Sequence, residues 1–256
     1  MKFVSIDKEK CIGCGKCVAD CVSEKIKLVN GKAEYMYERC IECGHCYAIC
    51  PVKAVSMENF SGFEGEDVYD VTKIDSDKLL SAMKSRRTIR RFKDKEISKD
   101  NIEKIIEAGR YCPTGTNSQD FAFTVLQKSI PEIEKDCVKL FRFVKNTATP
   151  FSKYIKNMTI NDNFFFKGSN AVIIVSGKGS TSSCLASSYM ELMAASLGIG
   201  VLYSGFFIAA AKLNPKILKK LDLPKGHSPV TCLVLGYPDV EYKRIPPRKK
   251  AEIKYL

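Results

Sequence analysis

Apolar residues recur at helical spacing in two stretches of the second part of the chain. The first stretch follows Ser76, which can cap a helix that runs from about residue 77 into a group of arginines. The second stretch covers 99–108 and lies between Ser98, a favourable N-cap, and Gly109, which can close a helix. The pattern therefore predicts two helices before residue 110.

Runs of β-branched and large apolar residues predict buried strands at 121–126, 171–175 and 230–235. Residues 181–197 predict a helix with small or apolar residues on nearly every side, so we expect it to be buried, and a subunit interface is a natural place for it. Asn214 followed by Pro215 predicts the start of a further helix. Because strands and helices interleave, the fold class expected is α+β with a mixed central sheet.

The first 60 residues contain a cysteine repeat. Residues 11–21 read CIGCGKCVADC and residues 40–50 read CIECGHCYAIC, so one pattern occurs twice, 29 residues apart, with seven of eleven positions identical. The spacing C-x2-C-x2-C-x3-C is typical of two 4Fe-4S clusters, where three cysteines of one loop bind one cluster and the fourth reaches the other. We therefore predict two ligand sets: Cys11, Cys14, Cys17 and Cys50 for one cluster, and Cys40, Cys43, Cys46 and Cys21 for the second.

Two other uses of cysteine fit this pattern less well. A zinc site would pair two C-x2-C units, roughly 12–20 residues apart, around one ion. A disulfide framework would need an oxidising compartment, and residues 1–8 contain no apolar signal segment. His45 is expected at the surface or beside a cluster, because cysteines already supply every ligand. The other cysteines are expected to be small core residues: Cys112, Cys137, Cys184 and Cys232.

The composition predicts two domains joined by a linker. Residues 1–60 are expected to form a two-cluster ferredoxin-like domain whose small apolar core depends on the clusters. Residues 61–75 combine glycines with acidic residues and lack helical periodicity, so they are the predicted linker. Residues 76–256 are long enough for an ordinary hydrophobic core.

The charge is unevenly distributed along the chain. Of the net charge of +12, residues 1–60 contribute nine Lys/Arg against eight Asp/Glu, and residues 61–256 contribute 32 against 21. The lysines are scattered and no nucleic-acid-binding motif accompanies them, so we expect no nucleic-acid partner. No apolar run approaches the roughly 20 residues that span a membrane, so we expect no membrane partner and a cytoplasmic location.

Three separated segments of the second domain hold groups that could bind one ligand. In the first segment, 85–92, the three guanidinium groups within 86–90 and the hydroxyl of Thr88 suit a phosphate and a polar ring edge. Residues 112–119 are rich in small hydrogen-bonding groups, and 236–250 is a basic stretch. Each segment alone could equally be a solvated helix end, a turn or a basic tail. A turn at 177–182 partly matches a dinucleotide fingerprint, but its third glycine and the later acidic residue are missing, which favours a plain turn.

In this order, the three segments resemble the FMN-dependent nitroreductase family over about residues 75–256. The shared features are an arginine–serine/threonine motif, a Pro-x-x-x-Asn-x-Gln turn, the apolar helix and a strand that ends in Leu-Gly-Tyr-Pro. Asp120-Phe121 replaces the family's proline–tryptophan, so the resemblance does not determine the pocket wall beyond Gln119. The whole chain resembles a fusion of a bacterial-type two-cluster ferredoxin with a nitroreductase.

The resemblance implies an obligate homodimer with FMN at the subunit interface. It implies that the phosphate and ribityl chain are held by Arg86, Arg87 and Thr88, and that Arg90 approaches the pyrimidine edge. The backbone of Ser204 and Gly205 would meet the flavin N5. The residues of the turn would bind the cofactor beside the flavin ring: Pro113, Thr114, Thr116, Asn117 and Gln119. Arg248 would return to the phosphate, with Lys249 and Arg244 as alternatives.

The resemblance implies an iron–sulfur flavoprotein oxidoreductase. It would reduce a small acceptor, nitro-like, quinone-like or another, while electrons pass between two 4Fe-4S clusters and FMN. No acid–base pair stands out, so no catalytic side chain is predicted. NAD(P)H, ferredoxin and flavodoxin remain open as external electron donors. The alternative is a relay module that delivers electrons to or from a partner redox protein.

Overall fold

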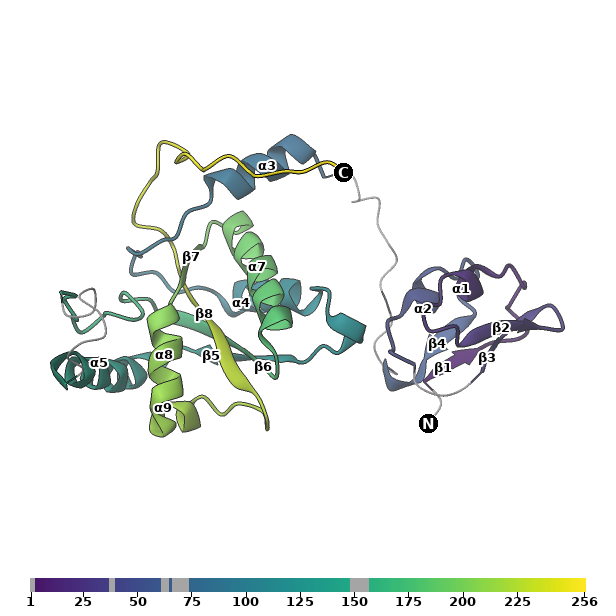
Figure 1. Ribbon diagram of the computed structural model, residues 1–256, viewed down its shortest axis with the longest axis horizontal. Helices are drawn as coiled ribbons and strands as arrows, with labels where there is room; N and C mark the ends of the chain where they lie inside the picture. Colours follow the sequence, from purple (N-terminus) through teal and green to yellow (C-terminus); the bar gives the residue numbers. More distant parts are fainter. Residues whose placement is uncertain (1–2, 37–39, 61–64, 66–73, 148–156) are drawn as a thin grey trace. The chain divides into compact units, whose positions relative to one another are not determined.

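The computed structural model describes residues 3–36, 40–60, 65, 74–147 and 157–256, without the side chains of 146 and 147. Its contacts divide the chain into two compact units, which are 1–73 with 114–118, and 74–113 with 119–256 (Figure 1). Each unit has a hydrophobic core of its own. Of the predicted linker 61–75, only residues 65, 74 and 75 lie within the described ranges.

The first unit contains two small antiparallel sheets and two short helices. Strand β1 (Val4–Ile6) pairs with β4 (Val55–Met57), and β2 (Ile26–Val29) pairs with β3 (Lys32–Tyr35). One short helix lies in each cysteine repeat, and a 3-10 turn follows β4: α1 (Lys16–Ala19), α2 (His45–Ala48) and η1 (Glu58–Phe60). Cys11 and Cys17 belong to the core of this unit, beside Val4 and Val55.

A glycine stands immediately before each of these two helices. Gly15 precedes α1 with φ 71°, and Gly44 precedes α2 with φ 75°. Both values lie in the left-handed region, where a side chain would be strained. The equivalent glycines of the repeat therefore let both loops turn in the same way between their second and third cysteines.

The second unit is built on a four-stranded sheet in the order β5-β6-β8-β7. The strands are β5 (Phe121–Leu126), β6 (Ala171–Gly177), β7 (Gly200–Tyr203) and β8 (Ser228–Gly236). The three strand pairings are antiparallel, and an isolated parallel bridge between Thr88 and Val201 makes the arrangement mixed. The predicted α+β class is thus confirmed.

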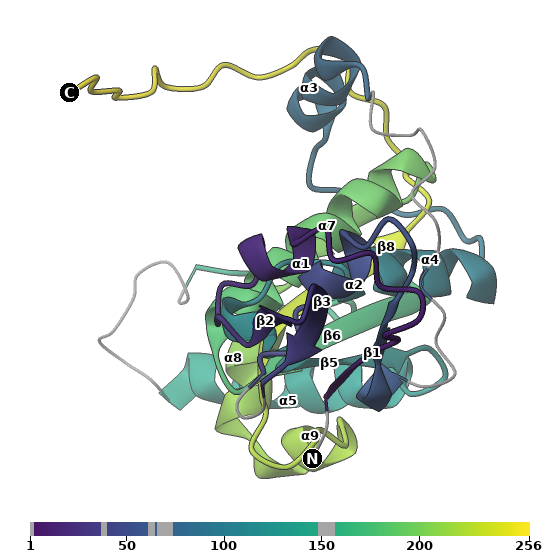
Figure 2. The same cartoon turned by 90° about the vertical axis from the view of Figure 1, so that its right-hand side faces the viewer.

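Helices cover both faces of this sheet. Side chains of α4 (Lys99–Arg110) and α7 (Ser180–Ser196) form one core cluster with one face of the sheet. The opposite cluster is formed by the sheet with α5 (Ile130–Thr147), α8 (Gly205–Leu213) and α9 (Pro215–Lys220). Figure 2 shows α4 and α7 on one side of the sheet and α5 and α9 on the other. Because both faces are covered, every residue of β6 is buried.

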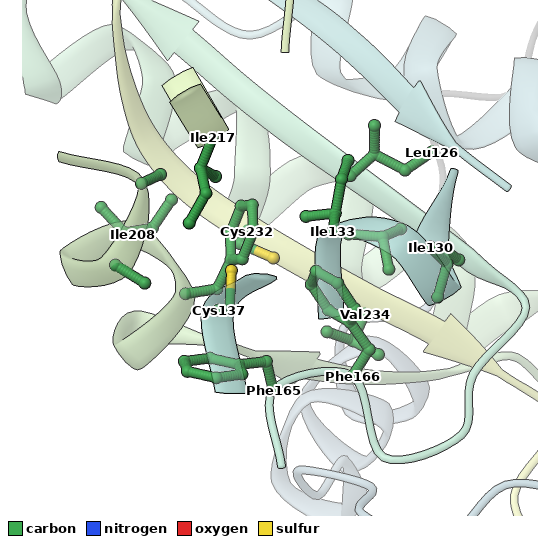
Figure 3. Packing of buried hydrophobic residues seen from close by; sticks show 14 of the residues in the cluster. Leu126, Ile130, Ile133, Cys137, Phe165, Phe166, Ile208, Ile217, Cys232 and Val234 are labelled. Atoms are coloured by element: carbon green, nitrogen blue, oxygen red, sulfur yellow. The ribbon is translucent and has the colours of Figure 1, made fainter. Parts of the chain in front are cut away.

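The cluster under α5 contains two fully buried cysteines. Cys137 of α5 and Cys232 of β8 are 0% and 1% exposed, and Figure 3 shows them together among apolar side chains. Cys112 is also buried, as expected, but Cys184 is exposed. The expectation for Cys184 is wrong because α7 buries only one of its sides within a single chain, and Cys184 lies on the other side with Leu185 and Tyr189.

Two helix ends differ from the sequence expectation. The N-cap of α3 (Ser76–Ser85) is Asp75, whose side chain accepts a hydrogen bond from the amide of Lys78 at 2.9 Å, so Ser76 is the first helical residue and not the cap. Helix α4 starts after Ser98 as predicted, but it continues through Gly109 to Arg110. Gly109 faces α7, where a Cβ would approach Met190 Cγ to 2.7 Å, so this glycine allows close helix packing and does not close the helix.

Within the described ranges, none of the helices is both long enough and apolar enough to cross a membrane.

Candidate functional site

The structure places the eight cysteines of the repeat around two hollows of the first unit. The first hollow is lined by Cys11, Cys14, Cys17 and Cys50. The second is lined by Cys21, Cys40, Cys43 and Cys46. Each hollow therefore takes three cysteines from one copy of the repeat and the last cysteine of the other copy, which is the grouping that the spacing predicts.

Main-chain amides point at one or more sulfur atoms of each set. Ala33 N donates to Cys11 Sγ at 3.4 Å and Ala54 N donates to Cys50 Sγ at 3.2 Å. In the other set, Lys25 N donates to Cys21 Sγ and Glu42 N to Cys40 Sγ, both at 3.3 Å. Such bonds stabilise negative charge on sulfur, which a metal-bound thiolate carries.

The donor sets fit a cluster better than a single ion. Among the described side chains, no group of three or more His, Cys, Asp and Glu could hold one metal ion. In a cluster each thiolate binds a different iron, which suits four cysteines that line one hollow. His45 lies at the surface, where its Nδ1 is 3.1 Å from Asp20 Oδ2, which agrees with a role outside the ligand sets.

In the second unit, the arginine segment follows α3 and runs along the edge strand β7. Ile89 N donates to Val201 O at 3.0 Å, and Thr88 forms the parallel bridge with Val201. Ile89 is buried against Gly200, where a Cβ would lie 2.4 Å from its Cγ1. The segment is therefore held against the sheet by backbone bonds and by close packing.

Arg86 has an acidic partner that sequence reasoning missed. Its Nη1 donates to Glu191 Oε1 of α7, and the two side chains are 28% and 11% exposed. Desolvation raises the pKa of Glu191, and the positive charge of Arg86 opposes that rise. The hydroxyl of Tyr203 in β7 donates to Ser187 O of the same helix at 2.9 Å. The available signal was that Glu191 is the only charged residue within 180–196.

Arg86 and Arg87 line a shallow hollow of about 480 Å³ beside β7, together with Glu191, Gly198 and Pro238. Arg90 lies outside this hollow and is exposed. It is close enough to Lys167 that its charge lowers the pKa of that lysine, after the larger effect of burial. Lys167 is thus a second cation near Arg90 that the sequence did not indicate.

Ser204 and Gly205 lie where β7 ends and α8 begins. Ser204 is buried, and its amide donates to Cys232 O at 2.9 Å. Gly205 is exposed, and a Cβ built there would have no neighbouring atom within 4 Å. The arginine segment thus bridges to Val201 of β7, and the open backbone position at Gly205 follows the end of the same strand, four residues beyond Val201.

The remaining predicted residues lie on two other segments, the turn around 113–119 and the stretch after β8. The turn at 114–118 contains the 3-10 helix η2 (Gly115–Asn117), and its contacts group it with the first unit, whereas Pro113 and Gln119 belong to the second. Three residues within or next to this turn adopt left-handed backbone angles, which are strained for residues with a side chain: Thr116 (φ 52°), Asn117 (φ 54°) and Gln119 (φ 45°). Arg248 lies on the exposed stretch after β8 and does not line the hollow of Arg86.

Comparison with known proteins identifies both parts of the chain. The model of the nitroreductase family matches residues 83–237, and that of the 4Fe-4S dicluster domain matches residues 3–51. A NADPH-dependent oxidoreductase of Staphylococcus haemolyticus is 26% identical over 177 residues, which cover 64% of this chain and 66% of that protein. The match thus spans slightly less than two thirds of that relative.

Solved structures agree on the fold of the second unit. A nitroreductase from Bacteroides fragilis with bound FMN has a TM-score of 0.58 at 22% identity and covers 70% of this chain and 98% of its own. A nitroreductase from Desulfitobacterium hafniense with bound FMN has a TM-score of 0.59 at 21% identity, with the same coverage of 70% and 98%. Because the family match spans more than half of the sequence, the chain belongs to the nitroreductase family, with a 4Fe-4S dicluster domain fused ahead of it.

Proposed function

We propose that this protein is an iron–sulfur flavoprotein oxidoreductase that reduces a small acceptor with electrons exchanged between two 4Fe-4S clusters and FMN. The observation that carries the proposal is the grouping of eight cysteines around two hollows, in a chain that belongs to the nitroreductase family. The nitroreductases of similar fold have bound FMN, which supports the same cofactor here.

The cysteines around the hollows are the proposed cluster ligands, in the two sets that line them. When bound, the clusters supply single-electron transfer and FMN supplies hydride transfer. The protein's contribution at the clusters is to direct amides at sulfur, so that negative charge on the ligands is stabilised. Such amide bonds reach both sets, from Ala33 and Ala54 in the first and from Lys25 and Glu42 in the second.

The second unit offers groups that fit a flavin mononucleotide. We assign the phosphate and ribityl chain to Arg86, Arg87 and Thr88, because two guanidinium groups line one hollow and the backbone beside Thr88 is fixed to β7. Glu191 holds Arg86 by one nitrogen and leaves its other N–H groups for a phosphate. Arg248 remains the proposed further phosphate contact, with Lys249 and Arg244 as alternatives.

The flavin ring would lie against the end of β7. Space around Gly205 allows a planar ring to approach the backbone of Ser204 and Gly205 closely. Arg90 would place a positive charge at the pyrimidine edge, where a reduced flavin gains negative charge. The turn residues complete this assignment: Pro113, Thr114, Thr116, Asn117 and Gln119.

We also propose a homodimer with the flavin at the subunit interface. Two helices carry apolar side chains that one chain leaves exposed. On α7 these include Leu185 and Tyr189, which are 39% and 43% exposed, and on α3 they include Leu80, which is 47% exposed. A second copy would remove these apolar surfaces from water, as obligate interfaces do.

The staphylococcal relative is described as NADPH-dependent, which supports NAD(P)H as an electron donor here, with ferredoxin or flavodoxin as protein donors. The test is anaerobic purification followed by analysis of iron, sulfide and flavin. We expect about eight irons and about eight sulfides for two clusters, and about one FMN per chain. About one zinc or about four irons per chain would contradict the two-cluster proposal.

Turnover separates the enzyme from a relay module. We expect the purified protein to reduce small nitro or quinone acceptors with a reduced donor. Rapid re-oxidation of the clusters by ferredoxin or flavodoxin, without turnover of any small acceptor, would instead indicate a relay of electrons between proteins.

A further inference from the structure

The second cysteine hollow has a tyrosine in its wall. Tyr35 ends β3, pairs with Ile26 across the hairpin and is 6% exposed. It lines the hollow of the second set together with Cys40, and its hydroxyl is buried. A phenol beside a metal-bound thiolate can only donate, because the thiolate has no proton to offer.

The first hollow lacks an equivalent group. The repeat offset of 29 residues places Ile6 where the second copy has Tyr35, five residues before the first cysteine in each case. Ile6 lines the first hollow, and none of the described residues around that hollow carries a hydroxyl. The main-chain amides do not distinguish the two sets, since they donate to sulfur atoms of both.

Charged groups also differ between the hollows. Lys32 Nζ donates to Cys11 O at 2.5 Å, which places a cation beside the first set, and Lys16 lines the same hollow. The second hollow is lined by Lys25 and Glu42, whose opposite charges offset each other, and by His45, which is paired with Asp20. The first set therefore has the more positive surroundings, and Tyr35 adds a hydroxyl donor to the second.

We propose that Tyr35 is a positioning residue that tunes the second cluster by donating a hydrogen bond to Cys40, with no counterpart at the first cluster. The inference rests on the proposed binding of two clusters. Reduction adds one negative charge to a cluster, so a donor at a ligand sulfur stabilises the reduced form more than the oxidised form. The hydroxyl should therefore raise the reduction potential of the second cluster alone.

The test is Tyr35→Phe in the full-length holoprotein, with both cluster potentials measured by anaerobic redox titration followed by electron paramagnetic resonance. Phenylalanine keeps the buried ring and removes only the hydroxyl. We expect one midpoint potential to fall and the other to stay unchanged. The fall corresponds to about a fivefold change in the reduction equilibrium of that cluster. At 59 mV per tenfold for one electron, this is about 40 mV. Iron content should match the wild type.

Two further variants sharpen the result. Tyr47→Phe makes the same chemical change at a 39% exposed tyrosine of the same unit, whose hydroxyl accepts from Gly65 N at 3.1 Å, and should shift neither potential. Lys32→Gln removes the cation beside Cys11 and should lower the potential that Tyr35→Phe leaves unchanged.

Several outcomes would overturn the inference. Unchanged potentials in Tyr35→Phe, with two clusters bound, would show that the hydroxyl does not tune the cluster. Loss of iron in this variant would show a structural role. If Tyr35→Phe and Lys32→Gln lowered the same potential, the hydroxyl would act on the cluster beside Lys32 and not on the second cluster alone. A wild-type protein without two clusters would instead refute the proposed function on which the inference depends.

Discussion

At the scale of single residues, polar groups in the second unit are placed by partners that lie far away in sequence. Arg86 meets Glu191, 105 positions later, and the carboxylate of Glu134 accepts bonds from Phe165 N and Phe166 N at 2.7 and 2.8 Å. These partners satisfy buried charge, which is costly to leave unpaired. In the proposed flavin site, Arg86 is thus oriented by Glu191, a residue that is not assigned to the ligand.

The roles assigned to the arginines can be separated by substitution. Arg86→Ala should weaken FMN binding by about 1.5–3 kcal/mol, the range for a lost hydrogen bond to a charged group. Arg90→Ala should instead leave most of the affinity and lower the flavin potential, because a cation near the pyrimidine edge stabilises the reduced, more negative ring. Flavin binding titrations and anaerobic reductive titrations measure the two effects.

Arg91→Ala is the matched control for both variants. Arg91 lies in the same segment, but its Nη2 donates to Asp239 O at 2.7 Å, and it is not assigned to the flavin. We expect near wild-type affinity and potential. An unchanged potential in Arg90→Ala, with FMN still bound, would mean that another residue, such as Lys167, meets the pyrimidine edge.

Buried thiols predict a loss of stability at alkaline pH. Desolvation raises the pKa of Cys137 from 9.0 to about 12, so the folded chain keeps a proton that the unfolded chain loses. The stabilisation is therefore complete below about pH 9 and is lost as the pH rises toward 12, by up to about 1.4 kcal/mol per pH unit. Cys137→Ser removes this titration, so its urea midpoint should fall less between pH 8 and 10 than that of the wild type.

Cys184→Ser makes the same change at an exposed cysteine and should follow the wild-type pH profile. Parallel profiles for wild type and Cys137→Ser would show that Cys137 is not desolvated in solution. Cys232 lies beside Cys137, and burial raises its pKa as well, so some pH dependence should persist in the single variant.

At the scale of elements, helix ends and helix contacts depend on different information. The caps Asp75, Ser98 and Asn214 accept bonds from amides two or three residues ahead, so local sequence is sufficient to place them within one residue. The close approach of α4 to α7 is not local, because it depends on the absence of a side chain at Gly109 opposite Met190. Such a glycine looks like a helix terminator until the partner helix is known.

Gly109→Ala tests this contact. Alanine favours a helix by about 1 kcal/mol over glycine, but its Cβ would lie 2.7 Å from Met190 Cγ and 3.3 Å from Phe123 Cε1. Overpacking typically costs about 1–3 kcal/mol, so we expect a net loss of stability of about 1 kcal/mol by chemical denaturation. In a Met190→Ala background the clash is absent, and the same substitution should become stabilising. A stabilising effect in the wild-type background would show that α7 can move away.

At the scale of the whole molecule, each of the two units has its own core, and the second leaves apolar helix surface uncovered. The helix predicted to be apolar on nearly every side, α7, is buried on one side only. Its buried residues include Ala186, Met190 and Ala194. The amphipathic signal is therefore weak because a second apolar side is present. This is the pattern expected when a second copy covers the helix.

Sedimentation tests the dimer. We expect the wild type to sediment as a dimer at micromolar concentration, and Leu185→Glu to sediment as a monomer, because a charge in the centre of the apolar surface cannot be desolvated cheaply. Leu213→Glu is the matched control, since Leu213 at the end of α8 is 64% exposed and lies outside the proposed interface. A monomeric wild type, or a dimeric Leu185→Glu protein, would contradict the proposed interface.

The sequence by itself determined the features that depend on short separations or on strong apolar runs. Cysteine spacing indicated the two ligand groups, because each loop positions three sulfurs through a few covalent bonds. Strands β5, β6 and β8 were readable because a sheet covered on both faces needs continuous apolar residues. Neither α5 nor β7 was predicted, although Ile130, Ile133 and Cys137 recur at helical spacing, and the four residues of β7 are too few for a periodic signal.

Only the tertiary structure decided which distant groups meet. The pairing of Arg86 with Glu191, the close packing at Gly109 and the placement of Tyr35 and Cys40 around one hollow depend on how distant segments pack. A sequence pattern records which residues are apolar or charged, but the partner of a side chain is chosen by distance in space. Local spacing therefore predicts the cofactor chemistry, whereas the residues that orient and tune it emerge only from the fold.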